Sequence, residues 1–221
     1  SARLGMKNAF ITGVGKDDRG KMIMKELNKE GIDIQYIQID PKVETNFHFA
    51  LCFQGERTIL LKQNKFNYKV PSKLDTQWIY FSSTTIGTEK FNKKFGRFLI
   101  KNKQVKLGFN PGTFQMRMAA NALRDIYNRT EILFLNRDEA QLVLKQSTRN
   151  VKALLQGLHK LGPKIVVITD GRDGSYASNG SSRVWYIEEF VGPKIEATGA
   201  GDAYGTAFIS AMFHGKTIPE A

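Results

Sequence analysis

Residues 196–208 read Glu-Ala-Thr-Gly-Ala-Gly-Asp-Ala-Tyr-Gly-Thr-Ala-Phe, a run of small residues that carries one carboxylate and continues into an apolar helix. Small residues at the start of a helix leave backbone N–H groups accessible, and these groups and the helix dipole favour an anion such as a phosphate. Asp202 lies in the first turn, close enough to such an anion to accept a proton from a hydroxyl group. The alternative interpretation is a tight loop in which Asp202 only caps the helix.

The chain has 221 residues, of which 41% are hydrophobic and 24% are charged, which is typical of a folded globular protein. Its length suits one main domain with an appendage. No apolar run approaches the ~18 residues of a membrane span, and the first residues lack the apolar stretch of a signal peptide. Cys52 is the only cysteine, so no intrachain disulfide can form. These features predict a soluble, cytoplasmic protein without a membrane partner.

The net charge of +12 raises the alternative of a basic nucleic-acid-binding domain. The basic residues are spread along the chain, and the densest group lies within residues 90–103, where it alternates with Phe, Leu and Ile. Such alternation is typical of a helix with one solvated face, although a binding face has the same pattern. We therefore expect no nucleic-acid partner.

Short apolar runs alternate with amphipathic helices over most of the chain. The predicted strands are 78–82, 105–109, 132–135 and 164–169, and the predicted helices are 89–102, 113–127, 138–144 and 151–161. Residues 175–177 and 183–188 predict a hairpin. This order predicts an α/β fold with a mostly parallel central sheet and helices on both faces.

Residues 32–62 differ, because apolar strands at 34–39, 47–53 and 58–62 follow one another without a helix between them. They predict a small antiparallel β lid, and residues 1–31 and 63–221 would then form the α/β core. Within the core, Asp17 and Asp18 open a predicted helix. They suit helix capping, and a catalytic pair is the alternative.

Polar or glycine-rich loops follow three of the predicted strands. These loops are 110–112, 136–139 and 169–174. In an open parallel sheet, ligands bind beyond the carboxyl ends of the strands. We therefore expect the three loops to lie on one rim, together with the loop that begins the last helix.

Together these segments resemble the ribokinase-like (PfkB-type) family of sugar and nucleoside kinases. Residues 197–203 are similar to the family's C-terminal signature, Asn136 and Glu139 to its Asn-x-x-Glu motif, and the loop from Thr169 to a nucleotide-phosphate loop. The resemblance implies that Asp202 is the catalytic base and that the backbone of Gly199, Ala200 and Gly201 forms an anion hole.

The resemblance further implies transfer of the γ-phosphoryl group of ATP to a hydroxyl group of a sugar or nucleoside. The implied nucleotide-binding residues are Asn136, Glu139, Thr169, Gly171, Gly174 and Thr198. Asn136 and Glu139 would organise Mg²⁺ through water, and a monovalent cation is a further implied cofactor. We assign Thr45 and Asn110 to the acceptor site, and the apolar strands of the lid permit a homodimer.

Local structure alone offers simpler roles for some of these residues. Asn136 and Glu139 also suit the cap and first turn of a helix, and Thr169 suits a plain turn.

The chain also departs from the family pattern. Glu196 stands where the family usually has an aspartate, and the family's N-terminal strand and C-terminal helices are expected outside residues 1–221. These departures keep a non-catalytic nucleotide- or sugar-binding protein as an alternative. A dehydrogenase fits less well, because Tyr204 stands where a dinucleotide-binding motif needs glycine.

Overall fold

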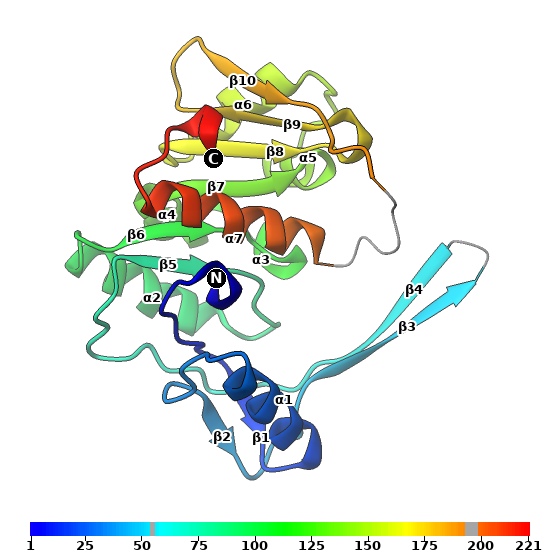
Figure 1. Ribbon diagram of the computed structural model, residues 1–221, viewed down its shortest axis with the longest axis vertical. Coiled ribbons are helices and arrows are strands. Elements are labelled where there is room, and N and C mark those ends of the chain that lie inside the picture. Colours follow the sequence, from blue (N-terminus) through cyan, green and yellow to red (C-terminus); the bar gives the residue numbers. More distant parts are fainter. Residues whose placement is uncertain (54–55, 193–198) are drawn as a thin grey trace. The chain divides into compact units, whose positions relative to one another are not determined.

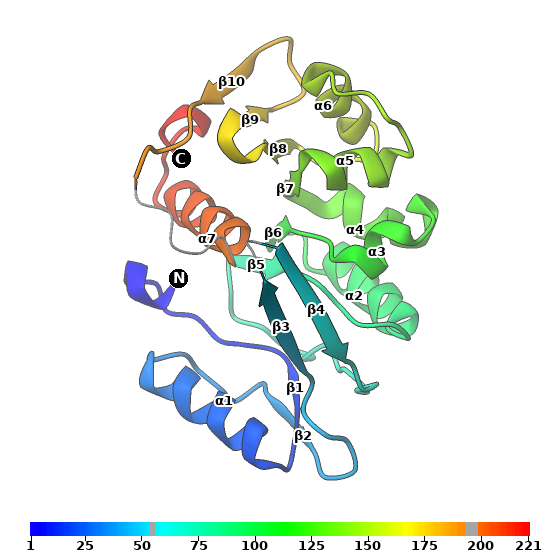
Figure 2. The same cartoon turned by 90° about the vertical axis from the view of Figure 1, so that its right-hand side faces the viewer.

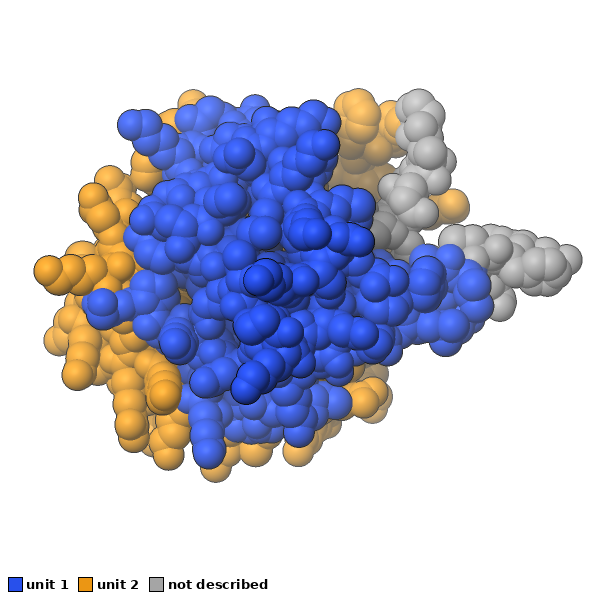
Figure 3. Space-filling view, turned by 90° about the horizontal axis from the view of Figure 1, so that it is seen from below, with its two compact units in different colours: residues 1–72, 85–91 blue, residues 73–84, 92–221 orange. Residues whose placement is uncertain are grey.

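The computed structural model describes residues 1–53, 56–192 and 199–221. Its contacts divide the chain into two compact units, which Figure 3 colours separately. Unit 1 comprises residues 1–72 and 85–91, and unit 2 comprises residues 73–84 and 92–221.

Unit 2 is built on a six-stranded sheet in the order β10-β9-β8-β7-β6-β5. Strands β5 to β8 are parallel, whereas β9 pairs antiparallel with both β8 and β10. The strands are β5 (Trp78–Phe81), β6 (Lys106–Phe109), β7 (Thr130–Asn136), β8 (Ile165–Thr169), β9 (Ser175–Ser178) and β10 (Val184–Ile187). The sheet and the β9–β10 hairpin confirm the fold class predicted from the sequence.

Helices cover both faces of this sheet. Helix α7 lies on one face, and α4, α5 and α6 lie on the other (Figures 1 and 2). The helical segments are α2 (Glu89–Lys101), α3 (Thr113–Arg117), η2 (Ala120–Leu123), α4 (Arg124–Arg129), α5 (Arg137–Leu144), α6 (Val151–His159), η3 (Gly171–Asp173), α7 (Ala200–Phe213) and η4 (Ile218–Glu220). Because β7 and β8 are covered on both faces, they are nearly continuous runs of buried apolar residues.

Helix α7 packs very closely on the sheet. A Cβ atom at Gly108 on β6 would lie 2.3 Å from Cδ1 of Ile209, so only glycine allows this approach. Phe208 and Ile209 of α7 join a buried cluster with side chains of β7, β8 and β9, namely Ile132, Phe134, Ile165, Val167 and Ala177. The apolar C-terminal half of α7 therefore anchors the helix.

In unit 1, a short parallel pair and a hairpin form two separate small sheets. Strand β1 (Gly13–Gly15) pairs in parallel with β2 (Gln38–Asp40), and β3 (Phe47–Phe53) pairs antiparallel with β4 (Glu56–Lys62). The other helical segments are η1 (Ala2–Leu4) and α1 (Asp18–Lys29). The sequence placed the strand at 34–39 in the antiparallel lid, and this was wrong. Helix α1 is a crossover that brings β2 beside β1 in parallel.

The predicted helix over 113–127 is also interrupted. Met118 and Ala119 have extended backbone, with ψ of 153° and 136°, so α3, η2 and α4 replace one long helix. The division by contacts places residues 1–31 with the β3–β4 hairpin, whereas the sequence assigned them to the core. The domain boundaries expected from the sequence stay a prediction.

The basic residues of α2 lie on its solvent face. Lys93, Lys94 and Arg97 are exposed, whereas Phe95 and Leu99 of the same helix are buried. This agrees with the amphipathic pattern. Across the described ranges, we find no helix whose length and apolar character would let it cross a lipid bilayer.

We expect Phe208→Ala to destabilise the protein by about 3–5 kcal/mol, because a large side chain would leave a cavity in a closely packed core. Phe208 is only 2% exposed and contacts Phe134 edge-to-face. Phe213→Ala is the matched control on the same helix, since Phe213 is 40% exposed. Chemical denaturation measures both, and equal losses for the two variants would contradict the anchoring role of Phe208.

Candidate active site

The carboxyl ends of the parallel strands meet at one edge of the large sheet, as expected. Asn136 at the end of β7 pairs in register with Thr169 at the end of β8, and Asn110 follows β6. They face an open pocket of about 210 Å³. Its lining residues are Asn110, Phe134, Leu135, Asn136, Glu139, Thr169, Gly199, Gly201, Asp202 and Tyr204. Loops far apart in the sequence therefore converge with the start of α7.

The first turn of α7 has the geometry expected of an anion site. Gly199 is the N-cap and has φ of 80°, in the left-handed region that favours glycine. A Cβ atom at Gly199 or Gly201 would meet no heavy atom of the described residues within 4 Å, so the turn is open on that side. A glycine cap has no side-chain oxygen for the first N–H groups of the helix. These groups are therefore suited to an anion from outside the chain.

Asn136 and Glu139 form a reciprocal capping box at the start of α5. The backbone N–H of Glu139 donates to Oδ1 of Asn136 at 2.8 Å, and the N–H of Asn136 donates to Oε2 of Glu139 at 2.8 Å. The same two side chains line the pocket. Burial raises the pKa of Glu139, and the nearby charges of Asp138 and Asp202 raise it further, while the N–H of Asn136 opposes the shift.

Tyr80 on β5 is a neighbour of Asp202 that the sequence did not predict. Its hydroxyl group donates to Oδ1 of Asp202 at 3.4 Å and is also hydrogen-bonded to the side chain of Asn110. Burial, and then the charge of Asp202, raise the pKa of Tyr80, so the hydroxyl group keeps its proton. Gly205 makes room for it, because a Cβ atom there would lie 2.9 Å from the tyrosine oxygen.

One sequence signal could have drawn attention to Tyr80. A tyrosine in a strand of a covered sheet needs a polar partner for its hydroxyl group. Nothing local identifies that partner, since Asp202 lies 122 residues further along the chain.

A second unexpected feature is an ion pair between Arg137 and Asp170, which joins the start of α5 to the loop after β8. The sequence signal for it is positional. Each residue directly follows the last residue of its strand, and the two charges are opposite.

The loop after β8 contributes less to the pocket lining than expected. Gly171 and Gly174 have φ of 57° and 76°, but neither is among the lining residues within the described part of the chain. Gly174 allows a close approach instead, because a Cβ atom there would lie 2.2 Å from the carbonyl oxygen of Ile187 on β10. Ala200 is likewise absent from that lining. Thr198 and Glu196 lie outside the described residues.

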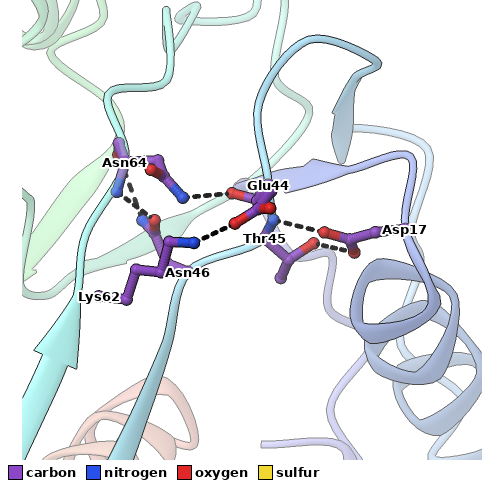
Figure 4. A network of polar contacts seen from close by, with 6 residues as sticks. All are labelled: Asp17, Glu44, Thr45, Asn46, Lys62 and Asn64. Atoms are coloured by element: carbon purple, nitrogen blue, oxygen red, sulfur yellow. Dashed lines mark hydrogen bonds and ion pairs between the residues drawn. The ribbon is translucent and has the colours of Figure 1, made fainter.

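Thr45 belongs to unit 1, where it is 2% exposed and lies in a network of polar contacts (Figure 4). Its hydroxyl group donates to Oδ1 of Asp17 at 2.6 Å and accepts from the N–H of Gly15 at 2.8 Å. The N–H of Thr45 donates to Oδ2 of Asp17 at 2.7 Å, and Asp17 also accepts from the N–H of Gly20 as the cap of α1. The capping interpretation of Asp17 is confirmed, and an acceptor-binding role for Thr45 stays a prediction.

The same network continues to the base of the β3–β4 hairpin. The amide of Asn46 accepts from the N–H of Asn64 at 2.6 Å, and the amide of Asn64 donates to the carbonyl oxygen of Glu44 at 2.8 Å. Lys62 forms an ion pair with Glu44. These contacts tie the two strands to the segment that carries Thr45 (Figure 4).

Comparison with known proteins agrees with this arrangement. The family model described as pfkB family carbohydrate kinase matches residues 1–221. The chain therefore belongs to the pfkB family of carbohydrate kinases. This confirms the family suggested by the sequence motifs and the assignment as a sugar or nucleoside kinase.

Individual relatives show how varied the similar proteins are. An ATP-dependent 6-phosphofructokinase of Thermoanaerobacterium thermosaccharolyticum is 23% identical, with 100% of this chain and 71% of that protein covered. A cytidine kinase of Thermococcus kodakarensis is 28% identical, with 100% and 79% covered. The crystal structure of a putative ribokinase II from E. coli, in complex with ATP and Mg²⁺, has a TM-score of 0.80 at 22% identity. The superposed region covers 97% of this chain and 72% of the ribokinase II chain.

We expect Thr45→Val to raise the pKa of Asp17, because both the hydroxyl and the backbone N–H of Thr45 hold that pKa at about 2 in the folded protein. The lowered pKa means that Asp17 stabilises the fold above about pH 4, its ordinary value, and that this contribution is lost as the pH falls towards 2. An NMR titration of the Asp17 carboxylate measures the change.

Thr58→Val is the control, since Thr58 is an exposed residue of β4. The loss of unfolding free energy between about pH 4 and pH 2 should be smaller in Thr45→Val than in the unchanged protein, and it should be unchanged in Thr58→Val. An unchanged pKa of Asp17 in Thr45→Val would contradict the role of the network.

Proposed function

We propose that the chain transfers the γ-phosphoryl group of ATP to a hydroxyl group of a sugar or a nucleoside. The observation that carries this proposal is the convergence of Asp202 and the open turn of α7 with Asn136, Glu139 and Thr169 around one pocket. The pocket offers helix-terminal N–H groups for phosphate oxygens and a carboxylate for a proton. The putative ribokinase II of similar fold, named as a complex with ATP and Mg²⁺, supports the use of ATP and Mg²⁺.

In the proposed reaction, the acceptor hydroxyl oxygen forms a bond with the γ-phosphorus, and the bond from that phosphorus to the bridging oxygen of ADP breaks. Asp202 accepts the proton of the hydroxyl group. The first N–H groups of α7 stabilise the charge on the transferred group. Products are then ADP and a phosphorylated acceptor, with Asp202 protonated until the proton passes to solvent.

The residues at the pocket fit a magnesium ion that is held jointly with phosphates. Asn136 and Glu139 present oxygen atoms, which Mg²⁺ prefers, and the capping box uses only Oε2 of the glutamate carboxylate. Within the described residues, no group of three acidic, histidine or cysteine side chains could hold a metal ion. Mg²⁺ would neutralise phosphate charge. Its positive charge would also favour the ionised form of Glu139, whose pKa is raised by burial and by the charges of Asp138 and Asp202.

A phosphorylation screen tests the proposal most directly. Ribose, fructose, sugar acids, fructose phosphate and nucleosides are offered with ATP and Mg²⁺, and phosphorylated product is measured. Product formed from any of these acceptors supports the kinase. Binding of nucleotide without product from any of them would favour a non-catalytic binding protein of the same fold.

We expect Asp202→Asn to lower kcat by about 10²–10⁴-fold with little change in the KM for ATP, because the amide cannot accept the hydroxyl proton. Asp125→Asn is the control, since Asp125 is an exposed carboxylate on α4. Steady-state kinetics measures both variants. A near-normal rate for Asp202→Asn would overturn its assignment as the base.

We expect Tyr80→Phe to lower kcat by about 2–10-fold with little change in the KM for ATP, because the Asp202 carboxylate loses the hydrogen bond that orients it. The change keeps the ring that packs on α7. Tyr127→Phe is the control, as Tyr127 is a buried tyrosine on α4 that does not line the pocket. Steady-state kinetics measures both variants, and an unchanged kcat in Tyr80→Phe would contradict this role of the Tyr80 hydroxyl group.

A further inference from the structure

The ion pair between Arg137 and Asp170 lies one residue beyond the paired strand ends. Asn136 of β7 is in register with Thr169 of β8, and the next residue on each strand carries one member of the pair. Nη2 of Arg137 contacts Oδ2 of Asp170 directly. The pair therefore extends the contact between β7 and β8 to the first residue of α5 and the first residue of the loop after β8.

This ion pair is placed where it contributes little to stability. The two side chains are only 14% and 11% exposed, so both charges have lost most of their hydration. Within the described residues, Nε of Arg137 is buried without a hydrogen-bond partner. Arg137 is also the first residue of α5, where the helix dipole disfavours a positive charge. A contribution to the stability of the fold therefore does not explain why the two charges are buried at this position.

Each member of the pair is adjacent to a residue that lines the pocket. Arg137 lies between Asn136 and Glu139 in the capping box, and Asp170 follows Thr169. A change in the distance between the two loops would move these lining residues apart. A displacement of about 1 Å at a binding constellation is enough to weaken function strongly.

We propose that Arg137 and Asp170 are positioning residues that set the distance between the capping box of α5 and the loop after β8, and thereby the fit of the nucleotide phosphates between them. This inference rests on the proposed function, since it takes the pocket to be the nucleotide site. Neither residue is assigned a contact with the substrate. Their effect on binding passes through Asn136, Glu139 and Thr169.

In a competing role, which we call charge balance, Arg137 only neutralises the Asp170 carboxylate near the phosphates. A double variant distinguishes charge balance from positioning. Arg137→Met alone leaves the Asp170 carboxylate unpaired beside the pocket, where it would repel phosphate. Arg137→Met combined with Asp170→Asn removes that repulsion but does not restore the link between the loops. Positioning therefore predicts that the double variant binds nucleotide as weakly as the single ones, whereas charge balance predicts recovery.

The chain offers a matched control at the other end of the same two strands. Nζ of Lys164, which precedes β8, lies 2.8 Å from Oε2 of Glu131 near the start of β7. This second pair joins the same strands, but at the edge of the sheet opposite the pocket. Lys164→Met therefore removes a β7–β8 ion pair without touching the proposed nucleotide site.

The test is calorimetric titration of MgADP into the protein and its variants, with thermal unfolding recorded for each. We expect the Kd for MgADP to rise about tenfold in Arg137→Met, in Asp170→Asn and in the double variant. Lys164→Met should keep the Kd within about twofold of the original value. Where Arg137→Met does not fold, Arg137→Lys retains the charge with a shorter reach and should show a smaller rise in Kd.

The outcomes separate this inference from the proposed function. Failure of the unchanged protein to bind MgADP would overturn the proposed function and this inference with it. Binding by the unchanged protein, together with an unchanged Kd in the folded Arg137 and Asp170 variants, would overturn the positioning role alone. Recovery of the original Kd in the double variant would also overturn it, in favour of charge balance. An equal rise in Lys164→Met would show a general loss of sheet stability instead.

Discussion

The candidate site depends above all on the close packing of α7 against the large sheet. Gly108 lets Ile209 approach the strand, and Phe208 is buried among side chains of β7 and β8. The first turn of the helix has a glycine cap and no capping side chain, so little local structure holds it. Its place beside the strand ends follows from the buried half of the helix two turns later. Core packing thus positions the residue proposed as the base.

Several polar side chains serve the backbone and the pocket at once. Asn136 and Glu139 close the capping box of α5 and also line the pocket, so their capping role is confirmed, while their role in binding nucleotide and Mg²⁺ stays a prediction. A side chain held by a cap has few rotamers left to lose when a ligand arrives. Asn110 similarly bonds Tyr80, which in turn bonds Asp202. The site is therefore ordered by the contacts that end the strands and begin the helices.

The sequence predicted those parts of the fold that depend on the local pattern of apolar and polar residues. Apolar runs with intervening amphipathic helices identified the parallel strands of unit 2, because a covered sheet requires such runs. The errors arose where tertiary contacts decide. Residues 34–39 are as apolar as a hairpin strand, yet β2 pairs in parallel with β1 across the crossover helix α1. The helical pattern of 113–127 likewise does not reveal the extended backbone at Met118.

The sequence by itself determined the local geometry of the candidate site. The glycine turn before Asp202, and the spacing of Asn136 and Glu139, depend on residues a few positions apart, whose geometry a single helix start imposes. Only the tertiary structure decided that Tyr80 meets Asp202 and that Arg137 meets Asp170. Those contacts depend on strand order, register and the seating of α7. No short segment of sequence specifies these, because they are set by how distant apolar faces pack together.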